Sequence, residues 1–302
     1  MPLDVVGLGE NSVDYVYRLP GPPSPNAKLP ITARRVSCGG QVATTLSTCA
    51  ALGLQAAYVG TFGDDENGGV IREALERRGV GTTHALVCPA PNRYAVILID
   101  ERTGERTVLW ERDPRLRLRP DEVPRDLIAG ARLLHVDGVD IDAAIAAARF
   151  ATEAGIPVTS DIEDVGSDTA ALVASVTVPI FAEHVPAALT GEPDIERALH
   201  LLRRQHAGLL CVTLGMRGAL LLEGDRLHRV PAFPVAAVDT TGAGDVFRGA
   251  FIYALLRGDP PAGIVRFATA AAAVSCTREG AMDSVPTLAE VERVLATKAT
   301  KI

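Results

Sequence analysis

The feature that most constrains the fold is a regular alternation of short apolar runs with longer helical stretches. Such β-prone runs occur at residues 3–9, 56–63, 132–138, 156–162, 177–183 and 209–215. Stretches with helical spacing of apolar residues lie between them, such as 141–154, which Gly155 closes, and 194–205. Alternating strands and helices predict parallel strands joined by crossover helices. We therefore expect a three-layer αβα fold with a mostly parallel central sheet.

Two segments interrupt this alternation. Residues 11–36 contain the Pro- and Gly-rich stretch RLPGPPSPNAKLP, and residues 93–111 predict two strands joined by the turn ERTG, which ends at Gly104. Together they predict a small β-sheet that acts as a lid over the ligand crevice at the carboxyl ends of the central strands. We expect residues 1–302 to form a single α/β domain with this lid, and the lid edges to support a homodimer.

The composition is that of a globular protein with an apolar core. Hydrophobic residues make up 47% and charged residues 22% of the 302 residues. We find no signal peptide and no uninterrupted apolar run of membrane-spanning length, and the five cysteines lack metal-binding spacing. These features predict a cytoplasmic protein with reduced thiols and no membrane partner. A net charge of −7 without a basic cluster argues against a nucleic-acid partner.

The segment DTTGAGDVFRGAF, residues 239–251, carries the clearest chemical signal. Its Gly-Ala-Gly run, residues 242–244, enters a helix, where free backbone N–H groups and the helix dipole favour a phosphate. No Lys follows at the spacing of a nucleotide-binding P-loop. Asp245 is placed to accept the proton of a substrate hydroxyl beside that anion site. The alternative is that Asp245 caps the helix, a role for which Thr240 or Thr241 is better placed.

Four segments resemble, in order, the motifs of the ribokinase-like (PfkB) carbohydrate kinases. They are SCGGQVATTLSTCAALGLQAAYVGTFGDDENG at 37–68, VTLGMRGALL at 212–221, the segment 239–251, and RFATAAAAVSCTREGAMDSVP at 266–286. The resemblance extends over nearly the whole chain and implies the fold of that family. It also implies transfer of the γ-phosphate of ATP to a primary hydroxyl of a small sugar, a ketose or pentose such as fructose or ribose. The implied cofactors are ATP, Mg²⁺ and K⁺.

The resemblance further implies roles for individual residues. Asp245 is the expected catalytic base, and the backbone of Gly242, Ala243 and Gly244 is the expected anion hole. The expected sugar ligands are Asp14, Gly39, Gly40, Gln41, Thr44 and Asp137. The expected contacts to ATP are Thr213, Gly215, Gly218, Thr269 and Ala273. The residues expected around a monovalent cation are Asp239, Thr241, Ser275, Gly280 and Ser284.

Two places depart from the family pattern. Ala182 and Val185 stand where family members carry an Asn-x-x-Glu motif near the magnesium ion and the phosphates, and Glu183 is a partial substitute. Thr44 stands where ribokinases have an Asn that binds the sugar. The segments SDIEDV at 160–165 and FAEHVPAALTG at 181–191 resemble the ketohexokinase and sulfofructose kinase branches.

Other functions are less consistent with the residues present. A dinucleotide-dependent oxidoreductase is disfavoured because Ser12 stands where the third glycine of its motif belongs. A non-catalytic sugar-binding relative is disfavoured because it has no need of Asp245. A nucleoside kinase is disfavoured because an aromatic pocket is expected for it, whereas 4% of this chain is aromatic. For Asp14 and Asp137, roles as ordinary loop or capping acids stay open. Trp110 either stacks on a ligand or packs within the lid, and His135 is expected in the core without a metal.

Overall fold

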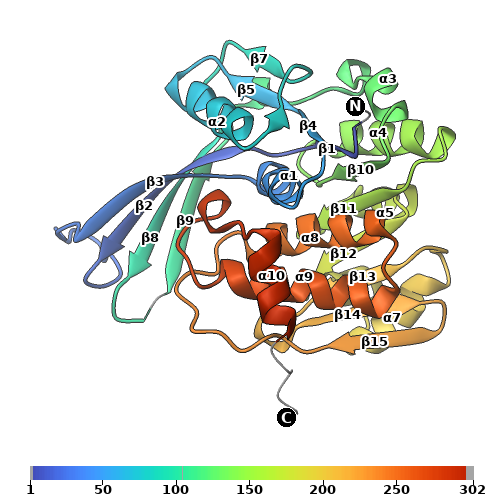
Figure 1. Ribbon diagram of the computed structural model, residues 1–302. Helices are drawn as coiled ribbons and strands as arrows, with labels where there is room; N and C mark the ends of the chain where they lie inside the picture. Colours follow the sequence, from blue (N-terminus) through green and yellow to red (C-terminus); the bar gives the residue numbers. More distant parts are fainter. Residues whose placement is uncertain (1–2, 104, 297–302) are drawn as a thin grey trace.

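The computed structural model describes residues 3–103 and 105–296 and has a nine-stranded central sheet between two layers of helices (Figure 1). Its strands are β1 (Val5–Leu8), β4 (Ala56–Val59), β6 (Val80–Gly81), β10 (Leu133–Val136), β11 (Val158–Ile162), β12 (Val178–Ala182), β13 (Leu210–Thr213), β14 (Ala219–Glu223) and β15 (Arg226–Val230). Their order is β15-β14-β13-β12-β11-β10-β1-β4-β6. Neighbours from β13 to β6 are parallel, and the pairs of β14 with β13 and with β15 are antiparallel.

Each face of the sheet is covered by its own set of helices. One layer contains α1 (Gln41–Ala51), α2 (Glu66–Arg77), α8 (Ala243–Arg257), α9 (Pro261–Ser275) and α10 (Leu288–Ala296). The other contains α3 (Arg125–Ala129), α4 (Ile141–Glu153), α5 (Thr169–Ser175), α6 (Val185–Thr190) and α7 (Ile195–Arg203). Short 3₁₀ turns occupy Pro114–Leu116, Pro120–Glu122, Gly215–Arg217 and Met282–Ser284. The predicted αβα layers are thus present, and α4 and α7 are the two helices expected at 141–154 and 194–205.

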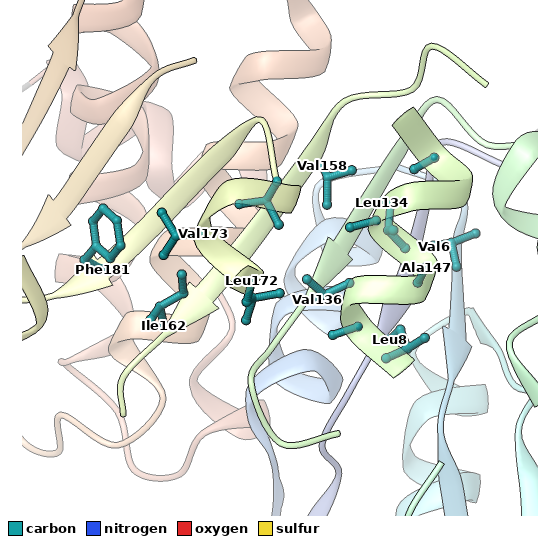
Figure 2. Packing of buried hydrophobic residues seen from close by; sticks show 14 of the residues in the cluster. Val6, Leu8, Leu134, Val136, Ala147, Val158, Ile162, Leu172, Val173 and Phe181 are labelled. Carbon is teal, nitrogen blue, oxygen red and sulfur yellow. The ribbon is translucent and has the colours of Figure 1, made fainter. Parts of the chain in front are cut away.

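The core lies on both faces of the sheet because adjacent strand residues point to opposite sides. Val5 packs toward α1 and Val6 toward α4, and both are fully buried. Figure 2 shows the second of these faces, where Val6, Leu134 and Val136 pack beside Ala147 of α4. Full burial of such an aliphatic side chain stabilises the fold by about 1.5 to 3 kcal/mol. The small alanine side chains let α4 lie close to the sheet.

A second, four-stranded sheet projects from one end of the central sheet (Figure 1). It consists of β2 (Ser12–Leu19), β3 (Ala33–Gly39), β8 (Tyr94–Asp100) and β9 (Arg106–Glu111), in the order β3-β2-β8-β9. We call it the lid sheet. The two strands expected within 93–111 are β8 and β9, and Gly104 lies outside the described residues. Residues 11–36 are more ordered than a Pro- and Gly-rich loop, since they supply β2 and the start of β3.

The register of the lid sheet determines which side chains face the rest of the molecule. Residues that lie opposite each other in paired strands share a face. Val16 of β2 is opposite Arg35 of β3 and Ile97 of β8, so these three residues share a face with Asp14, two positions earlier. Because Arg35 contacts Asp239, this is the face turned toward the large α/β body.

A further pair of short strands, β5 (Thr61–Gly63) and β7 (Leu86–Cys88), lies beside α2. In the described part of the chain, no helix combines the length and the apolar character that crossing a membrane requires.

Candidate active site

The segment predicted to bind an anion lies at the start of α8. Gly242 is the N-cap of the helix, with φ 74° and ψ 2°, a conformation that glycine adopts without strain. A Cβ atom on Gly242 would lie 2.7 Å from the Cα of Ala281, so no side chain fits. The N–H of Ala243 donates to the Thr240 carbonyl at 3.2 Å. An anion here would therefore accept hydrogen bonds from the later N–H groups of the first turn, beginning with that of Gly244.

Asp245 lies in the first turn of α8 beside two other carboxylates. One carboxylate oxygen from each of Asp161, Glu163 and Asp245 lies within 4.8 Å of the others. Burial raises the pKa of Asp245, the neighbouring Asp161 raises it further, and the Arg248 guanidinium opposes them. The net result is a pKa well above the ordinary value, which makes Asp245 a stronger base than an exposed aspartate.

Arg248 holds this group of acids together, and the sequence analysis missed it. Its side chain is buried, forms an ion pair with Asp161, and approaches Oε1 of Glu163 at 3.8 Å. A Cβ on Gly244 would lie 2.6 Å from Nη1 of Arg248, so that glycine also makes room for the guanidinium. The available signal was a lone charged residue in the otherwise apolar helical segment VFRGAFI, residues 246–252.

Asp14 and Gly39, two of the expected sugar ligands, lie together at the base of the lid sheet. A Cβ on Gly39 would lie 2.7 Å from Oδ2 of Asp14, and Ser12 donates its hydroxyl to Oδ1 of Asp14 at 2.7 Å. Arg93 donates to the Ser12 hydroxyl and pairs with Glu10 at 2.5 Å. Burial is the main influence on Asp14 and raises its pKa. This arrangement fixes the orientation of the Asp14 carboxylate.

Trp110 lies on the same face of the lid sheet as Asp14. It is opposite Ala95 of β8, which is in turn opposite Asp14 of β2. The indole is 66% exposed, and the Arg93 guanidinium carbon lies 6.0 Å from its ring centroid. Trp110 is therefore not part of the lid's packed interior, and its ring is accessible on the face turned toward the α/β body.

Asp137 follows β10 and is fully buried. Its two oxygens accept hydrogen bonds from the backbone N–H groups of Glu10 and Val139, at 2.6 and 3.0 Å. Burial first, and then the Glu10 carboxylate, raise the pKa of Asp137 to about 7. Both oxygens thus organise the loops that follow β1 and β10, which is the loop role that the sequence analysis left open.

The three remaining expected sugar ligands lie at the start of α1. Gly40 is its N-cap with φ 96°, and a Cβ there would lie 2.5 Å from the Cα of Asn11. Gln41 lines a hollow with Asp161 and Glu163. Thr44 is fully buried, and no hydrogen bond to its hydroxyl is found within the described residues. Gln41 is therefore the member of this group that lies beside the carboxylates.

The residues expected to contact ATP fall into two groups. Thr213, Gly215 and Gly218 lie at the end of β13 and in the turn before β14, where Gly218 has φ 95°. A Cβ on Gly218 would lie 2.0 Å from the Val230 carbonyl oxygen, so the turn closes tightly against β15. Thr269 and Ala273 are buried one turn apart in α9, and the Thr269 hydroxyl donates to the Val265 carbonyl at 2.8 Å.

Three of the residues expected around a monovalent cation, Asp239, Thr241 and Gly280, come together, and Arg35 lies beside them. The Asp239 carboxylate accepts hydrogen bonds from the N–H groups of Thr241 and Gly280, each at 2.9 Å, and from Arg35 at 2.7 Å. Burial alone would raise the pKa of Asp239, but these hydrogen bonds outweigh it and lower the pKa to about 2. The Ser275 and Ser284 hydroxyls donate to nearby backbone carbonyls.

The substitutions in the Asn-x-x-Glu motif leave few magnesium ligands at that position. Ala182 ends β12, and Val185 is fully buried at the start of α6. Glu183 pairs with Arg217 at 2.5 Å. Asp161 and Glu163 are better candidates for a divalent cation, because with Asp245 they place three carboxylates within 4.8 Å of one another and the one guanidinium of Arg248 balances only part of that charge.

An anion site at a helix N-terminus, a basic carboxylate in its first turn, and a lid carrying a second carboxylate define a phosphotransferase that acts on a hydroxyl. Residues 3–288 match the sequence profile described as pfkB family carbohydrate kinase. The chain belongs to this family. It is therefore a carbohydrate kinase, with an alcohol group as the phosphate acceptor, as the sequence analysis expected.

Individual relatives cover almost the whole chain. The chain is 30% identical over 319 residues to a probable fructokinase-4 of Arabidopsis thaliana, with 96% of each chain covered. The crystal structure of a putative ribokinase from Agrobacterium tumefaciens superimposes with a TM-score of 0.91 at 28% identity, over 98% of both chains. The Arabidopsis thaliana ribokinase solved with ribose and ATP gives 0.86 at 25% identity, over 98% of this chain and 99% of that one. These likenesses confirm the ribokinase-like fold with its lid sheet.

Proposed function

We propose that this kinase transfers the γ-phosphate of ATP to a primary hydroxyl of a small sugar, a ketose or pentose in its furanose form. The observation that carries the proposal is the Asp245 carboxylate in the first turn of α8, directly after the glycines of the anion site. In this position the carboxylate removes a proton from the acceptor hydroxyl, while the neighbouring backbone N–H groups bind the transferring phosphoryl group. A helix cap alone would not require the raised pKa of Asp245 or the adjacent acids.

The proposed reaction assigns a separate task to each residue. Asp245 accepts the proton as the sugar oxygen attacks phosphorus in line with the leaving ADP oxygen. The N–H groups that begin with Gly244 stabilise negative charge on the phosphoryl oxygens. Asp14 accepts hydrogen bonds from other sugar hydroxyls, and Gly39 lets the sugar approach the backbone. Closure of the lid sheet excludes water and so limits hydrolysis of ATP.

Magnesium is expected to enter with ATP, because it retains several waters and is held largely by phosphate oxygens. Asp161 and Glu163 are the residues that would hold it here, directly or through water. When bound, the ion neutralises charge that develops on the phosphates. Arg248 keeps Asp161 and Glu163 beside Asp245, and we assign it this positioning role.

We propose that the adenine ring and ribose of ATP lie over the turn after β13. Gly215 is exposed and Thr213 is half-buried there, at a tight backbone turn that allows close approach of a ligand, and the buried Gly218 closes this turn against β15. Thr269 and Ala273 lie on α9, which packs against β14 and β15, and they are not expected to touch the nucleotide, since both are buried.

For the acceptor, the relatives described above are named for fructose and ribose. They give no support to the ketohexokinase and sulfofructose kinase branches, whose resemblance rests on residues 160–165 and 181–191. We therefore favour fructose or ribose. A nucleoside remains the alternative acceptor within this fold, and the exposed ring of Trp110 on the site-facing side of the lid sheet is the group that would stack on a nucleobase.

We also propose that the protein forms a homodimer through its lid sheet and works in the cytoplasm. Strands β3 and β9 are the edges of the lid sheet, and unpaired edges favour pairing with a second chain. The face opposite Asp14 has an apolar hollow lined by Tyr17, Leu19, Leu29, Ile31, Val96 and Leu98. The five cysteines are free thiols, as is usual in a reducing compartment.

The first experiment measures ADP release from Mg-ATP with fructose, ribose, sulfofructose, 2-keto-3-deoxygluconate, inositols and nucleosides as acceptors. We expect one sugar to give a rate far above the rest and above ATP hydrolysis without acceptor. A nucleoside as the sole strong acceptor would replace the sugar proposal by the nucleoside alternative. If ATP binds but no acceptor raises the rate, the choice of a fructose- or ribose-like acceptor is wrong.

A further inference from the structure

We propose that Arg35 supplies, from within the chain, the positive charge that the family resemblance assigns to a bound monovalent cation. The kinase would then work without K⁺. Arg35 is a positioning residue in this proposal, because it acts through the loop that leads into the anion site. The proposal concerns residues of the lid sheet and of the segments 239–241 and 275–284.

The first observation is the place of the guanidinium. Arg35 extends from β3 and places Nη2 2.7 Å from Oδ2 of Asp239 and Nη1 3.6 Å from Glu279. A Cβ on Gly280 would lie 3.2 Å from Nη1 of Arg35, so the guanidinium lies directly against the turn at Gly280. The Asp239 side chain is only 9% exposed. The cation of this pair therefore lies beside Asp239 and Gly280, two of the expected ion ligands.

The second observation is that the charge of the Asp239 carboxylate is already balanced. Three donors bind this carboxylate, and one of them is the Arg35 guanidinium. The guanidinium would repel a potassium ion bound beside it, because two like charges at short range destabilise each other in a partly buried site. The residues present thus do not fit a monovalent cation while Arg35 is in place.

The third observation links Arg35 to catalysis. Asp239 holds the N–H of Thr241, which is followed by Gly242, and the N–H of Gly280, which is followed by Ala281. Ala281 and Gly242 are in close contact, since a Cβ on Gly242 would lie 2.7 Å from Ala281. The ion pair with Arg35 therefore holds in place the two segments, 241–242 and 280–281, that contact each other where α8 starts. Removal of the guanidinium leaves the largely buried Asp239 carboxylate without its cation, which destabilises the folded protein.

The decisive experiment measures thermal unfolding in KCl and in tetramethylammonium chloride at the same ionic strength. It needs no knowledge of the sugar, so its outcome is independent of the proposed acceptor. We expect the same unfolding temperature in both salts for the wild-type protein. For Arg35→Ala we expect a lower temperature that KCl raises by at least about 2 °C relative to tetramethylammonium, because the vacated site now binds K⁺. The control is Arg34→Ala, which removes the exposed neighbouring arginine and should show no difference between the salts.

The same variants are then compared in the kinase reaction, with the best acceptor. The wild-type rate should not change when tetramethylammonium replaces K⁺. Arg35→Ala should lose at least about tenfold without K⁺ and recover part of that loss with KCl or guanidinium chloride, and Arg35→Lys should retain most of the rate. A wild-type protein stabilised or activated specifically by K⁺ would overturn the proposal. An Arg35→Ala protein that folds but gains no K⁺-specific stabilisation would overturn it as well. If Arg35→Ala does not fold, the salt dependence of Arg35→Lys and of the wild-type protein decides between the two outcomes.

Discussion

Single residues in this kinase owe their chemistry to the charges that surround them. Asp245 is surrounded by Asp161 and Glu163, and its proton affinity rises because burial and these negative charges both disfavour the ionised form. Arg248 limits that rise and keeps the three acids together. A general base must take up a proton, and a raised pKa increases the proton affinity of the Asp245 carboxylate.

The Asp245→Asn variant tests this role. We expect kcat to fall by about 10²- to 10⁴-fold, the usual contribution of a general base, while the affinity for ATP stays the same. The measurements are steady-state rates and nucleotide binding by calorimetry. An exposed acid of the nearby loop serves as the control, and Asp168→Asn should leave kcat almost unchanged. A nearly normal kcat for Asp245→Asn would remove Asp245 from the mechanism.

His135 predicts how the stability of the protein depends on pH. It is fully buried, with Nδ1 2.9 Å from the Thr159 hydroxyl, and burial first, then Arg248, lower its pKa to about 3. Because the pKa in the folded state is below the value of 6.5 in the unfolded chain, the stabilisation is complete above pH 6.5 and is lost as the pH falls toward 3. At pH 4.5 this loss is about 2 to 3 kcal/mol.

We therefore expect the free energy of unfolding to decrease less steeply between pH 7 and 4.5 in His135→Gln than in the wild-type protein. Urea unfolding at several pH values measures this slope. The exposed His84 provides the control, and His84→Gln should keep the wild-type slope. Equal slopes for the wild-type protein and His135→Gln would show that His135 does not control the loss of stability at low pH.

At the scale of elements, α8 begins and ends with a left-handed glycine, but only the first is enclosed. Gly242 has φ 74° and contacts Ala281, whereas Gly258, the C-cap, has φ 84° and nothing within 4 Å of a Cβ. Gly258→Ala should cost only the backbone strain, about 1 to 2 kcal/mol. Gly242→Ala should cost more and also remove most of the kinase activity, since Ala281 must move and the anion site with it.

Urea unfolding and the kinase rate together test this pair of variants. The contrast is informative because both substitutions add the same methyl group to the same helix. If Gly242→Ala kept the wild-type rate, the geometry of the turn at Gly242 would not be needed for phosphate transfer.

The sequence predicted the elements better than the contacts between them. Each of the six apolar runs expected in the central sheet contains one of its strands, because burial on both faces leaves a continuous apolar signal. The start of α8 was equally readable, since the glycines and Asp245 are neighbours in the chain. Arg35 and Asp239 are 204 positions apart, and only the fold brings them together. The pair of Arg248 with Asp161 was missed for the same reason.

At the scale of the whole molecule, the lid sheet predicts self-association. Leu109 of β9 is 56% exposed and shares with Val96 the face that carries the apolar hollow. Light scattering at micromolar concentration should show a dimer for the wild type and a monomer for Leu109→Lys. Val87→Lys, a change at a similarly exposed valine (53%) of β7, should stay dimeric. A monomeric wild-type protein would contradict the proposed homodimer.

The pairing of β2 with β3 has a consequence for the order in which the substrates bind. Asp14, the proposed sugar ligand, and Arg35, the partner of Asp239, lie two residues apart in register on one face of this pair. A sugar that draws Asp14 inward therefore also presses Arg35 onto the loop that precedes the phosphate site. We therefore expect the two substrates to be energetically linked: the acceptor should tighten the binding of ATP, and, by thermodynamic reciprocity, ATP should tighten the binding of the acceptor by the same factor.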